Sequence, residues 1–125
     1  MTAEPSGSLR LRPAMRLRES RQFARIKAQG RRLVCGCLVA NWQELPPGTS
    51  AQVGIVTSRK LGNAVARSRA RRLLREAFRL HQHDLSKPVA LVLIARPSLA
   101  GQSWATVERD FLNALRHAKL LKNSP

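Results

Sequence analysis

The segment Ser58–Arg79, SRKLGNAVARSRARRLLREAFR, carries more information about the fold than any other part of this chain. Eight of its 22 residues are Lys or Arg, and only Glu76 is acidic. The cations alternate with apolar residues at helical spacing after a Gly-Asn start, which predicts a helix from Asn63 to about His81. Such a helix packs one face against a core and presents a strongly positive face that is suited to a polyanion.

The arginines and the apolar side chains of this predicted helix fall on largely opposite arcs at about 100° per residue. Like charges at i,i+4 repel by a few tenths of a kcal/mol per pair, and a solvated helix face usually mixes both signs. Guanidinium groups bind phosphate through two hydrogen bonds. The helix N-terminus, flanked by Arg59 and Lys60, adds N–H donors for a further phosphate. The pattern therefore favours a phosphate-rich partner for the row Arg67, Arg71, Arg75 and Arg79, with Arg72 beside it.

Composition limits the classes of protein to which the chain can belong. It has 125 residues, 43% of them hydrophobic, and a net charge of +16. This size and apolar content predict a single domain over residues 1–125, with mobile tails at about 1–12 and 122–125. No apolar stretch approaches the roughly 20 residues of a membrane span, and the N-terminus lacks a signal-peptide pattern. We expect a cytoplasmic protein whose polyanionic partner is a nucleic acid, not a membrane.

The remaining segments alternate between helical and strand patterns. The predicted elements are a helix at Arg21–Gln29 capped by Ser20, strands at Leu33–Trp42, Gln52–Ser58 and Pro88–Ala95, and a last helix after Ser103. Gly36 marks a bulge or a break into two strands. The uninterrupted apolar run of the Pro88–Ala95 strand indicates a central position with both faces covered. This order predicts an α+β fold, a two-layer sandwich with one sheet of about four strands.

The positions of the cysteines and of the acidic residues argue against a catalytic or metal site on the protein itself. Cys35 and Cys37 would point to the same face of one strand, a poor geometry for a disulfide, and no second Cys pair completes a zinc site. The seven acids are scattered, whereas a two-metal nuclease needs clustered carboxylates. The nearest pair, Glu108 and Asp110, is spaced i,i+2 on a predicted helix and does not converge.

The stretch Lys60–Arg79 resembles the signature of the bacterial ribonuclease P protein component, K-x-G-x-A-V-x-R-N-R-x-K-R-x-x-R-E. The glycine, the Ala-Val pair and five basic positions fall in register, and similarity extends from roughly Leu17 to Leu121. Three positions depart from the pattern. Ser68 replaces the central Asn of the motif, Arg71 replaces its Lys, and Lys27 stands where the family often has a second aromatic residue.

The resemblance implies an α-β-β-β-α-β-α sandwich, ribosomal protein S5 domain 2-like, with a left-handed crossover through the basic helix. It implies a protein subunit, 1:1 with a catalytic RNA, that assists endonucleolytic removal of the 5′ leader from precursor tRNA. Magnesium ions would be held mainly by the RNA, which performs the hydrolysis. The exposed sheet face, Phe23 and Lys27 would contact the leader. The implied RNA-binding residues are Arg59, Lys60, Asn63, Arg67, Ser68, Arg69, Arg71, Arg72, Arg75 and Arg79.

Other interpretations remain open from the residues alone. A structural RNA-binding protein of ribosomal type would carry the same charge without a role in cleavage, and an autonomous nuclease would depend on Glu108 or Asp110. Phe23 is equally a candidate core residue of a short amphipathic helix. Trp42 and Trp104 are expected to pack in the core or at its rim.

Overall fold

The computed structural model describes residues 11, 15–17 and 20–122 of the chain. The tails predicted to be mobile, 1–12 and 122–125, lie almost entirely outside these residues. A four-stranded mixed sheet has the order β1-β2-β4-β3. β1 (Arg31–Cys35) pairs antiparallel with β2 (Leu38–Glu44), and β2 with β4 (Val89–Ala95). β3 (Gln52–Val56) runs parallel to β4.

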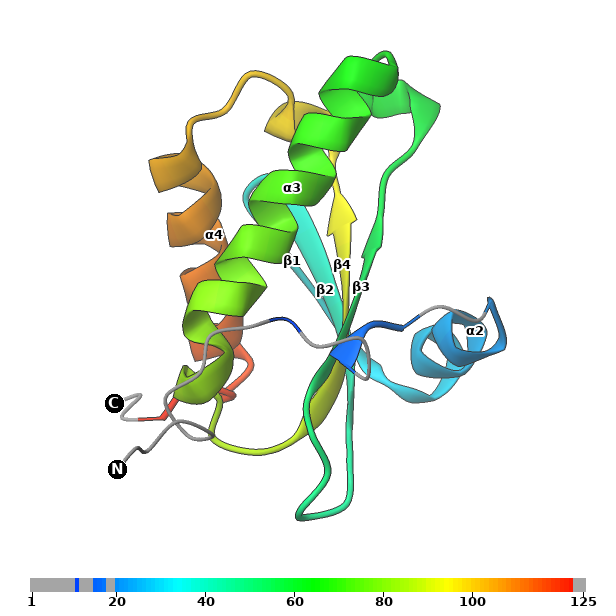
Figure 1. Cartoon of the computed structure of the whole chain (residues 1–125), viewed down its shortest axis with the longest axis vertical. Helices are drawn as coiled ribbons and strands as arrows, with labels where there is room; N and C mark the ends of the chain where they lie inside the picture. The colour runs from blue at the N-terminus through cyan, green and yellow to red at the C-terminus, as the bar shows by residue number, and fades with distance from the viewer. Residues whose placement is uncertain (1–10, 12–14, 18–19, 123–125) are drawn as a thin grey trace.

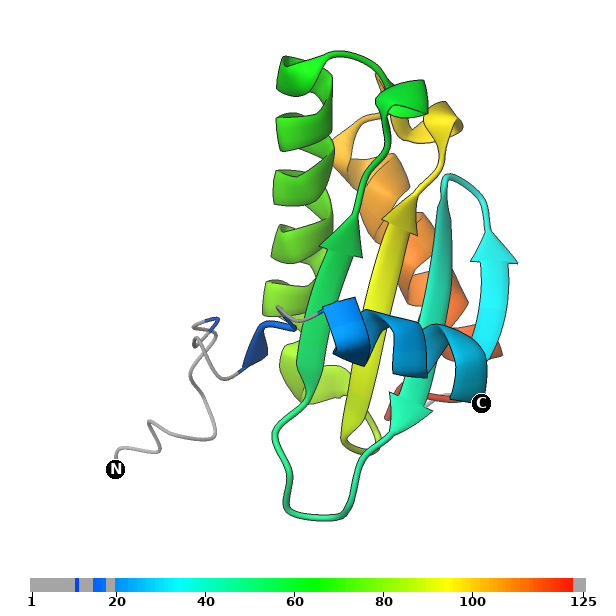
Figure 2. The same ribbon diagram turned by 90° about the vertical axis from the view of Figure 1, so that its right-hand side faces the viewer.

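Helices cover the two faces of the sheet unequally (Figures 1 and 2). α3 (Ala64–His81) and α4 (Trp104–His117) lie side by side on one face. α2 (Ser20–Gln29) crosses only part of the other face, so that the upper part of this face stays open. The α+β class, the four strands and the predicted order of elements are confirmed. α2 begins at Ser20 itself, one residue before the predicted start, because a helix end commonly extends by a residue beyond the strongest cap signal.

The connection from β3 through α3 to β4 is a left-handed crossover, which Figure 2 shows with α3 behind two neighbouring parallel strands. Nearly all such connections are right-handed. With this strand order, a right-handed connection would place α3 on the face that α2 crosses. The left-handed path brings α3 next to α4 and leaves the face with α2 open.

α3 forms where the sequence predicts it, between a side-chain cap and a buried stripe. Asn63 Oδ1 accepts the backbone N–H of Ala66 at 2.9 Å, so the helix begins after Asn63. The stripe that faces the core consists of Ala70, Leu74, Ala77 and Phe78. The helical wheel assigns Leu73 to the packed face of α3, but Leu73 is only half-buried. The reason is that the buried stripe is centred on Leu74 instead.

The central strand β4 is buried on both faces, as its apolar sequence predicts. On one side it packs under α3 and α4, and on the other its Ala90 and Val92 contact Ile26 of α2. β3 ends at Val56, two residues before the predicted end, because its pairing with β4 stops at Ile94. The sheet therefore supports α2 on one face and α3 on the other.

The predicted strand segment Leu33–Trp42 is a hairpin, so the break into two strands at Gly36 is confirmed and the bulge is not. Gly36, with φ of 57°, forms the turn with Cys37, and pairing extends outward to Arg31 opposite Trp42. The prediction that Cys35 and Cys37 share one strand face is therefore wrong, since the turn separates them. Both thiols are free. Burial and the neighbouring Asp110 carboxylate raise the pKa of the Cys37 thiol to about 12, so this thiol stays neutral.

Candidate RNA-binding surface

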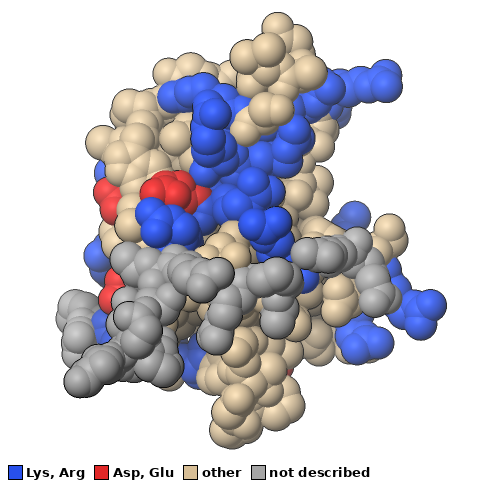
Figure 3. Space-filling model, viewed as in Figure 1, with Lys and Arg blue, Asp and Glu red and all other residues tan. Residues whose placement is uncertain are grey.

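The exposed side of α3 carries a continuous cluster of cations, visible as the blue area over the helix in Figure 3. Its centre is a shallow hollow of about 420 Å³, which we call the arginine hollow. Its lining residues are Leu11, Arg16, Arg72, Arg75, Glu76 and Arg79. Arg72 and Arg75 are exposed and make no hydrogen bond or ion pair within the described residues. They are therefore available to an anionic ligand.

Arg16 belongs to this surface although it lies more than 40 residues before α3 in the sequence. It forms a parallel bridge with Val53, and the backbone N–H of Leu17 donates to Val53 O at 2.8 Å. This pairing holds the N-terminal segment along β3 and brings the exposed Arg16 next to Arg75. Sequence analysis missed Arg16 because its Arg-Leu surroundings carry no helical period. The signal that indicates Arg16 is the alternation of arginine with apolar residues, which is typical of an extended segment that can pair with an edge strand.

Glu76, the single acid of α3, is bound by one arginine. Arg79 Nε donates to Glu76 Oε1 at 2.9 Å and Arg79 Nη2 to Glu76 Oε2 at 2.6 Å. The hydrogen bond from Arg79 holds the pKa of Glu76 below its ordinary value. The charge of Arg79 is thus compensated locally, and Arg72, Arg75 and Arg16 carry the uncompensated charge of the hollow.

Ser68, the position that departs from the family signature, orients a neighbouring arginine. Arg71 Nη2 donates to Ser68 Oγ at 3.1 Å, and Arg71 Nη1 donates to Thr57 Oγ1 at 2.9 Å. The guanidinium is therefore fixed between α3 and the end of β3, where it lines a second hollow on the open sheet face. Ser68 is exposed and acts here as an acceptor for Arg71.

Arg67 and Arg69, both predicted to face RNA, are tied to the protein backbone. Arg67 Nη1 donates to Gly62 O at 2.8 Å and braces the helix N-terminus. Arg69 Nη2 donates to Gln102 O at 2.6 Å and holds the loop that precedes α4. Both side chains are half-buried. Each guanidinium keeps further N–H groups, but its position is set by the fold.

The N-terminal end of α3 presents a second group of cations. Arg59 and Lys60 are exposed in a 3-10 turn, Arg59–Leu61, directly before the helix. Asn63 uses its side-chain oxygen for the cap, so its amide N–H groups are what it can offer to a ligand. Val65 in the first turn is 78% exposed, an apolar side chain left among cations. This end combines the N–H donors of the helix N-terminus with the two exposed charges of Arg59 and Lys60.

Phe23 of α2 lies over the edge strand β3, on the open sheet face. Its ring packs on Gly54 of β3, where a Cβ would meet the ring atoms, so glycine is required for this contact. Phe23 is half-buried and lines two adjoining hollows of about 270 and 460 Å³, one bordered by Arg75 and the other by Arg71. Phe23 is thus both a packing residue and part of an accessible surface. Lys27, one turn later, is exposed and lines neither hollow.

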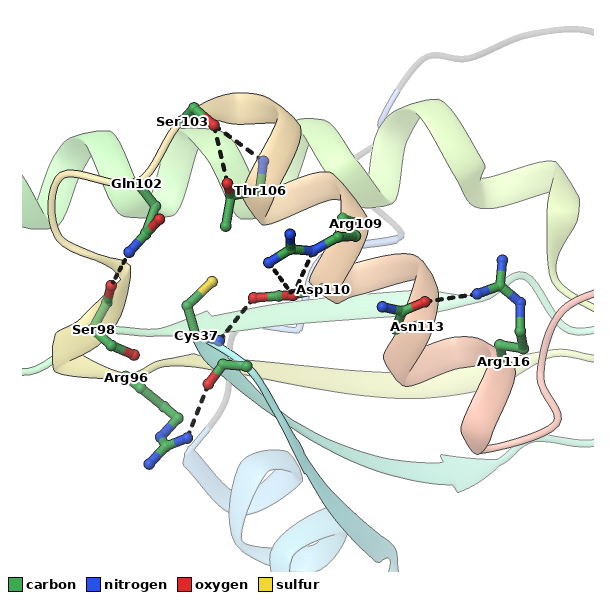
Figure 4. A network of polar contacts seen from close by, with 11 residues as sticks. Cys37, Arg96, Ser98, Gln102, Ser103, Thr106, Arg109, Asp110, Asn113 and Arg116 are labelled. Atoms are coloured by element: carbon green, nitrogen blue, oxygen red, sulfur yellow. Dashed lines mark hydrogen bonds and ion pairs between the residues drawn. The ribbon is translucent and has the colours of Figure 1, made fainter.

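The acids that an autonomous nuclease would need serve structural contacts. Asp110 is 6% exposed, and its Oδ2 accepts the backbone N–H of Cys37 at 3.0 Å, beneath the β1–β2 turn (Figure 4). Glu108 Oε2 lies 2.9 Å from His81 Nε2. Across the described part of the chain, no three His, Cys, Asp or Glu side chains are grouped so that they could hold a metal ion.

The Ribonuclease P family model matches residues 11–119, which include the whole sheet, all three helices and the arginine hollow. The chain belongs to the ribonuclease P protein component family. The protein component of Brevibacillus brevis is 31% identical over 110 residues, covering 88% of this chain and 87% of that protein. That of Gluconacetobacter diazotrophicus is 34% identical and covers 84% and 91%.

Solved structures of the family share the fold. The Staphylococcus aureus ribonuclease P protein superposes with a TM-score of 0.79 at 25% identity, covering 86% of this chain and 98% of that one. The Thermotoga maritima protein gives 0.72 at 31% identity, covering 82% and 96%. Membership in this family makes the chain a protein subunit of ribonuclease P, a ribonucleoprotein endoribonuclease of tRNA processing, with an RNA subunit as its partner. Within the described residues, no helix combines the length and apolar composition needed to cross a bilayer.

Proposed function

We propose that this subunit binds two RNA segments on two adjoining surfaces. The arginine hollow and the N-terminal end of α3 hold phosphates of the catalytic RNA, and the open sheet face around Phe23 holds the 5′ leader of precursor tRNA. The observation that carries the proposal is that the hollows on the sheet face are bordered by Arg71 and Arg75, so that apolar floor and cationic rim form one continuous surface.

The two surfaces differ in the chemistry that they offer. The arginine hollow presents guanidinium groups and no aromatic ring, which suits the phosphates of a folded RNA. The sheet face presents the Phe23 ring and the exposed aliphatic side chain of Val56, with an arginine at its edge. Aromatic stacking combined with a nearby cation is typical of sites for single-stranded RNA. A leader is single-stranded, so we assign it to the sheet face.

Magnesium does not fit the side chains in the described part of the chain. Three acids of α3 and α4 already have partners in the protein. Glu76 is bound by Arg79, Glu108 by His81 and Asp110 by the Cys37 N–H. The exposed arginines repel a divalent cation. We infer that the magnesium ions of the reaction are held by RNA phosphates, and that the arginines lower the repulsion between the RNA strands that approach one another there. We further propose one copy of the chain per RNA subunit, acting in the cytoplasm.

The test is cleavage of a precursor tRNA by a bacterial ribonuclease P RNA at low magnesium, with and without this protein. The protein should stimulate cleavage, and the double variant Arg72→Ala, Arg75→Ala should lose most of that stimulation. The matched control, Arg116→Ala with Lys122→Ala, removes two exposed charges away from the hollow and should retain it. Absence of stimulation by the unaltered chain, or equal loss in both double variants, would contradict the proposal.

The leader assignment needs its own comparison. Substrates with a one-nucleotide leader and with an eight-nucleotide leader should bind the complete enzyme with different affinity, because only the longer leader reaches the sheet face. Phe23→Ala should reduce the affinity for the long leader by roughly 5- to 150-fold, the range for one base–aromatic stack, and leave the short one unchanged. A reduction that is the same for both substrates would assign Phe23 to packing alone.

A further inference from the structure

A groove between α3 and α4 adjoins the arginine hollow, but most of its lining lies outside the two surfaces proposed above. It has a volume of about 440 Å³, and we call it the α3–α4 groove. Its lining residues are Arg72, Leu73, Glu76, Leu80 and Trp104. Leu73 and Leu80 are the half-buried leucines at the margin of the α3 stripe, and Trp104 is the first residue of α4. The groove therefore combines two aliphatic side chains, an indole, a cation and a carboxylate.

The groove is held open by contacts at both ends. At one end, Arg69 Nη2 donates to Gln102 O at 2.6 Å, which fixes the loop two residues before Trp104. Ser103 Oγ accepts the Thr106 N–H at 3.2 Å and sets the start of α4. One turn beyond Trp104, Glu108 Oε2 contacts His81 Nε2 at 2.9 Å and joins the two helices. The position of Trp104 relative to α3 is thus set before any ligand binds.

The two tryptophans of the chain have different surroundings. Trp42 is 6% exposed and belongs to the core, as expected. Trp104 packs at the rim of the core and remains half-buried, with part of its indole in the groove. A rigidly held indole beside an arginine is a surface on which a nucleobase can stack.

The groove is continuous with the arginine hollow, because Arg72 and Glu76 line both. We propose that the α3–α4 groove accepts one unstacked base of the RNA strand whose phosphates lie in the arginine hollow. This inference rests on the proposed RNA contact of α3. The base would lie against Trp104 and the two leucines. Each oxygen of the Glu76 carboxylate keeps a lone pair beside the hydrogen bond from Arg79, with which it can accept from amino or ring N–H groups at the base edge.

Trp104 itself supplies the measurement. An eight-residue oligoadenylate should quench the fluorescence of the unaltered protein at Trp104, since a stacked base shields and quenches an indole, whereas Trp42 is buried. Inorganic polyphosphate of similar charge should bind the arginine hollow and compete with the oligonucleotide without quenching. The emission of the variant Trp104→Leu gives the Trp42 contribution to be subtracted.

The binding affinities of two Trp104 variants distinguish the loss of base stacking from a loss of folding. Trp104→Leu should weaken oligoadenylate binding by roughly 5- to 150-fold and leave polyphosphate binding unchanged. Trp104→Phe keeps an aromatic face and should retain most of the affinity. If Trp104→Leu does not fold, the Trp104→Phe variant and the quenching of the unaltered protein by the two ligands still decide the question.

Three results would overturn the inference. If oligoadenylate binds but Trp104 emission does not change, or changes equally with polyphosphate, the groove holds no base and the arginine hollow keeps its role. If neither ligand binds, the proposed RNA contact of α3 itself is wrong. If Trp104 emission depends on protein concentration without any ligand, the groove is a contact between copies of the chain.

Discussion

Gly54 shows how a single residue without a side chain shapes the open sheet face. Its φ is ordinary, so a larger residue would meet no backbone strain there. The constraint comes mainly from the Phe23 ring above it, with the Leu17 Cβ as a second, looser contact. In the sequence, Gly54 stands within the predicted strand Gln52–Ser58 without any signal of a role of its own. Only the packing of α2 across β3 makes its small size necessary, because the ring and the strand come from segments about 30 residues apart.

We expect Gly54→Ala to destabilise the protein by about 1–3 kcal/mol, the usual cost of overpacking, because the new methyl group displaces Phe23. In a Phe23→Ala background the same change should cost little, since the ring is gone. The measurement is urea unfolding of both single variants and the double variant. Additive costs in this cycle would contradict the contact as the cause.

Asp110 is a second residue whose role comes from a distant partner. Its carboxylate lies directly under Gly36, and a Cβ there would clash with it. It accepts the Cys37 N–H, while Arg96 Nη1 donates to Gly36 O at 2.9 Å from the other side (Figure 4). The β1–β2 turn is therefore fastened to α4 and to the end of β4. An acid in the middle of a helix gives no sequence signal for such a contact.

Asp110→Ala should cost about 1–3 kcal/mol of stability, because it leaves the Cys37 N–H buried without an acceptor. The control is Arg109→Ala, which removes the 65% exposed partner of Asp110 and should cost at most about 1 kcal/mol. Thermal and urea unfolding of the two variants compare these costs directly. A larger loss in Arg109→Ala would show that the ion pair, not the turn, is what Asp110 supports.

At the scale of elements, one histidine adds polar contacts to the apolar packing between α3 and α4. His81 Nδ1 lies 2.8 Å from Asp84 Oδ2, its Nε2 lies 2.9 Å from Glu108 Oε2, and its ring faces Phe111 at a centroid distance of 6.2 Å. Burial lowers the pKa of His81, but the hydrogen bonds to Glu108 and Asp84 outweigh burial and raise it above the ordinary 6.5. The protonated ring joins the end of α3 to α4.

The sign of this shift gives a pH dependence. A raised pKa in the folded state means that the stabilisation is complete below about pH 6.5 and is lost as the pH rises through the folded pKa. Unfolding temperature should therefore fall as the pH rises above about 6.5, and His81→Gln should flatten this part of the profile. His117→Gln, at an exposed histidine, is the matched control and should keep it. A profile unchanged by His81→Gln would exclude the ion pair as its origin.

At the scale of the whole molecule, charge governs binding. The net charge of +16 is spread over several elements, but Arg16, Arg72 and Arg75 are the exposed arginines of the hollow whose charge no acid compensates within the described residues. Each phosphate contact contributes about 0.7–0.9 to the slope of log affinity against log salt. The full surface, with about six contacts, should lose on the order of a thousandfold in affinity between 50 and 200 mM salt.

The double variant Arg72→Ala, Arg75→Ala should lower that salt slope by about 1.4–1.8, two contacts fewer, with little change in unfolding temperature. Leu74→Ala should do the reverse, costing about 2–5 kcal/mol of stability at a fully buried position with no change in slope. Binding of the catalytic RNA measured at several salt concentrations, beside thermal unfolding, checks both. Unfolding of the arginine variant would mean that its side chains are part of the core.

The sequence by itself determined the elements and the chemistry of the main surface. Asn63 caps α3, the apolar run of β4 requires burial, and the row of arginines keeps its side of α3 out of the core. These features can be predicted from the sequence because each depends on neighbours within about four residues. The register of the Lys60–Arg79 motif identified the family on the same local grounds. Ser103 likewise set the start of α4.

Only the tertiary structure decided how these elements meet. The left-handed crossover, the arrival of Arg16 beside Arg75, the fastening of Arg69 to Gln102 and the half-exposed position of Trp104 all join segments far apart in the sequence. Such contacts depend on which surfaces pack together and on the direction of the chain between them. No local period records either, so these features follow from packing alone.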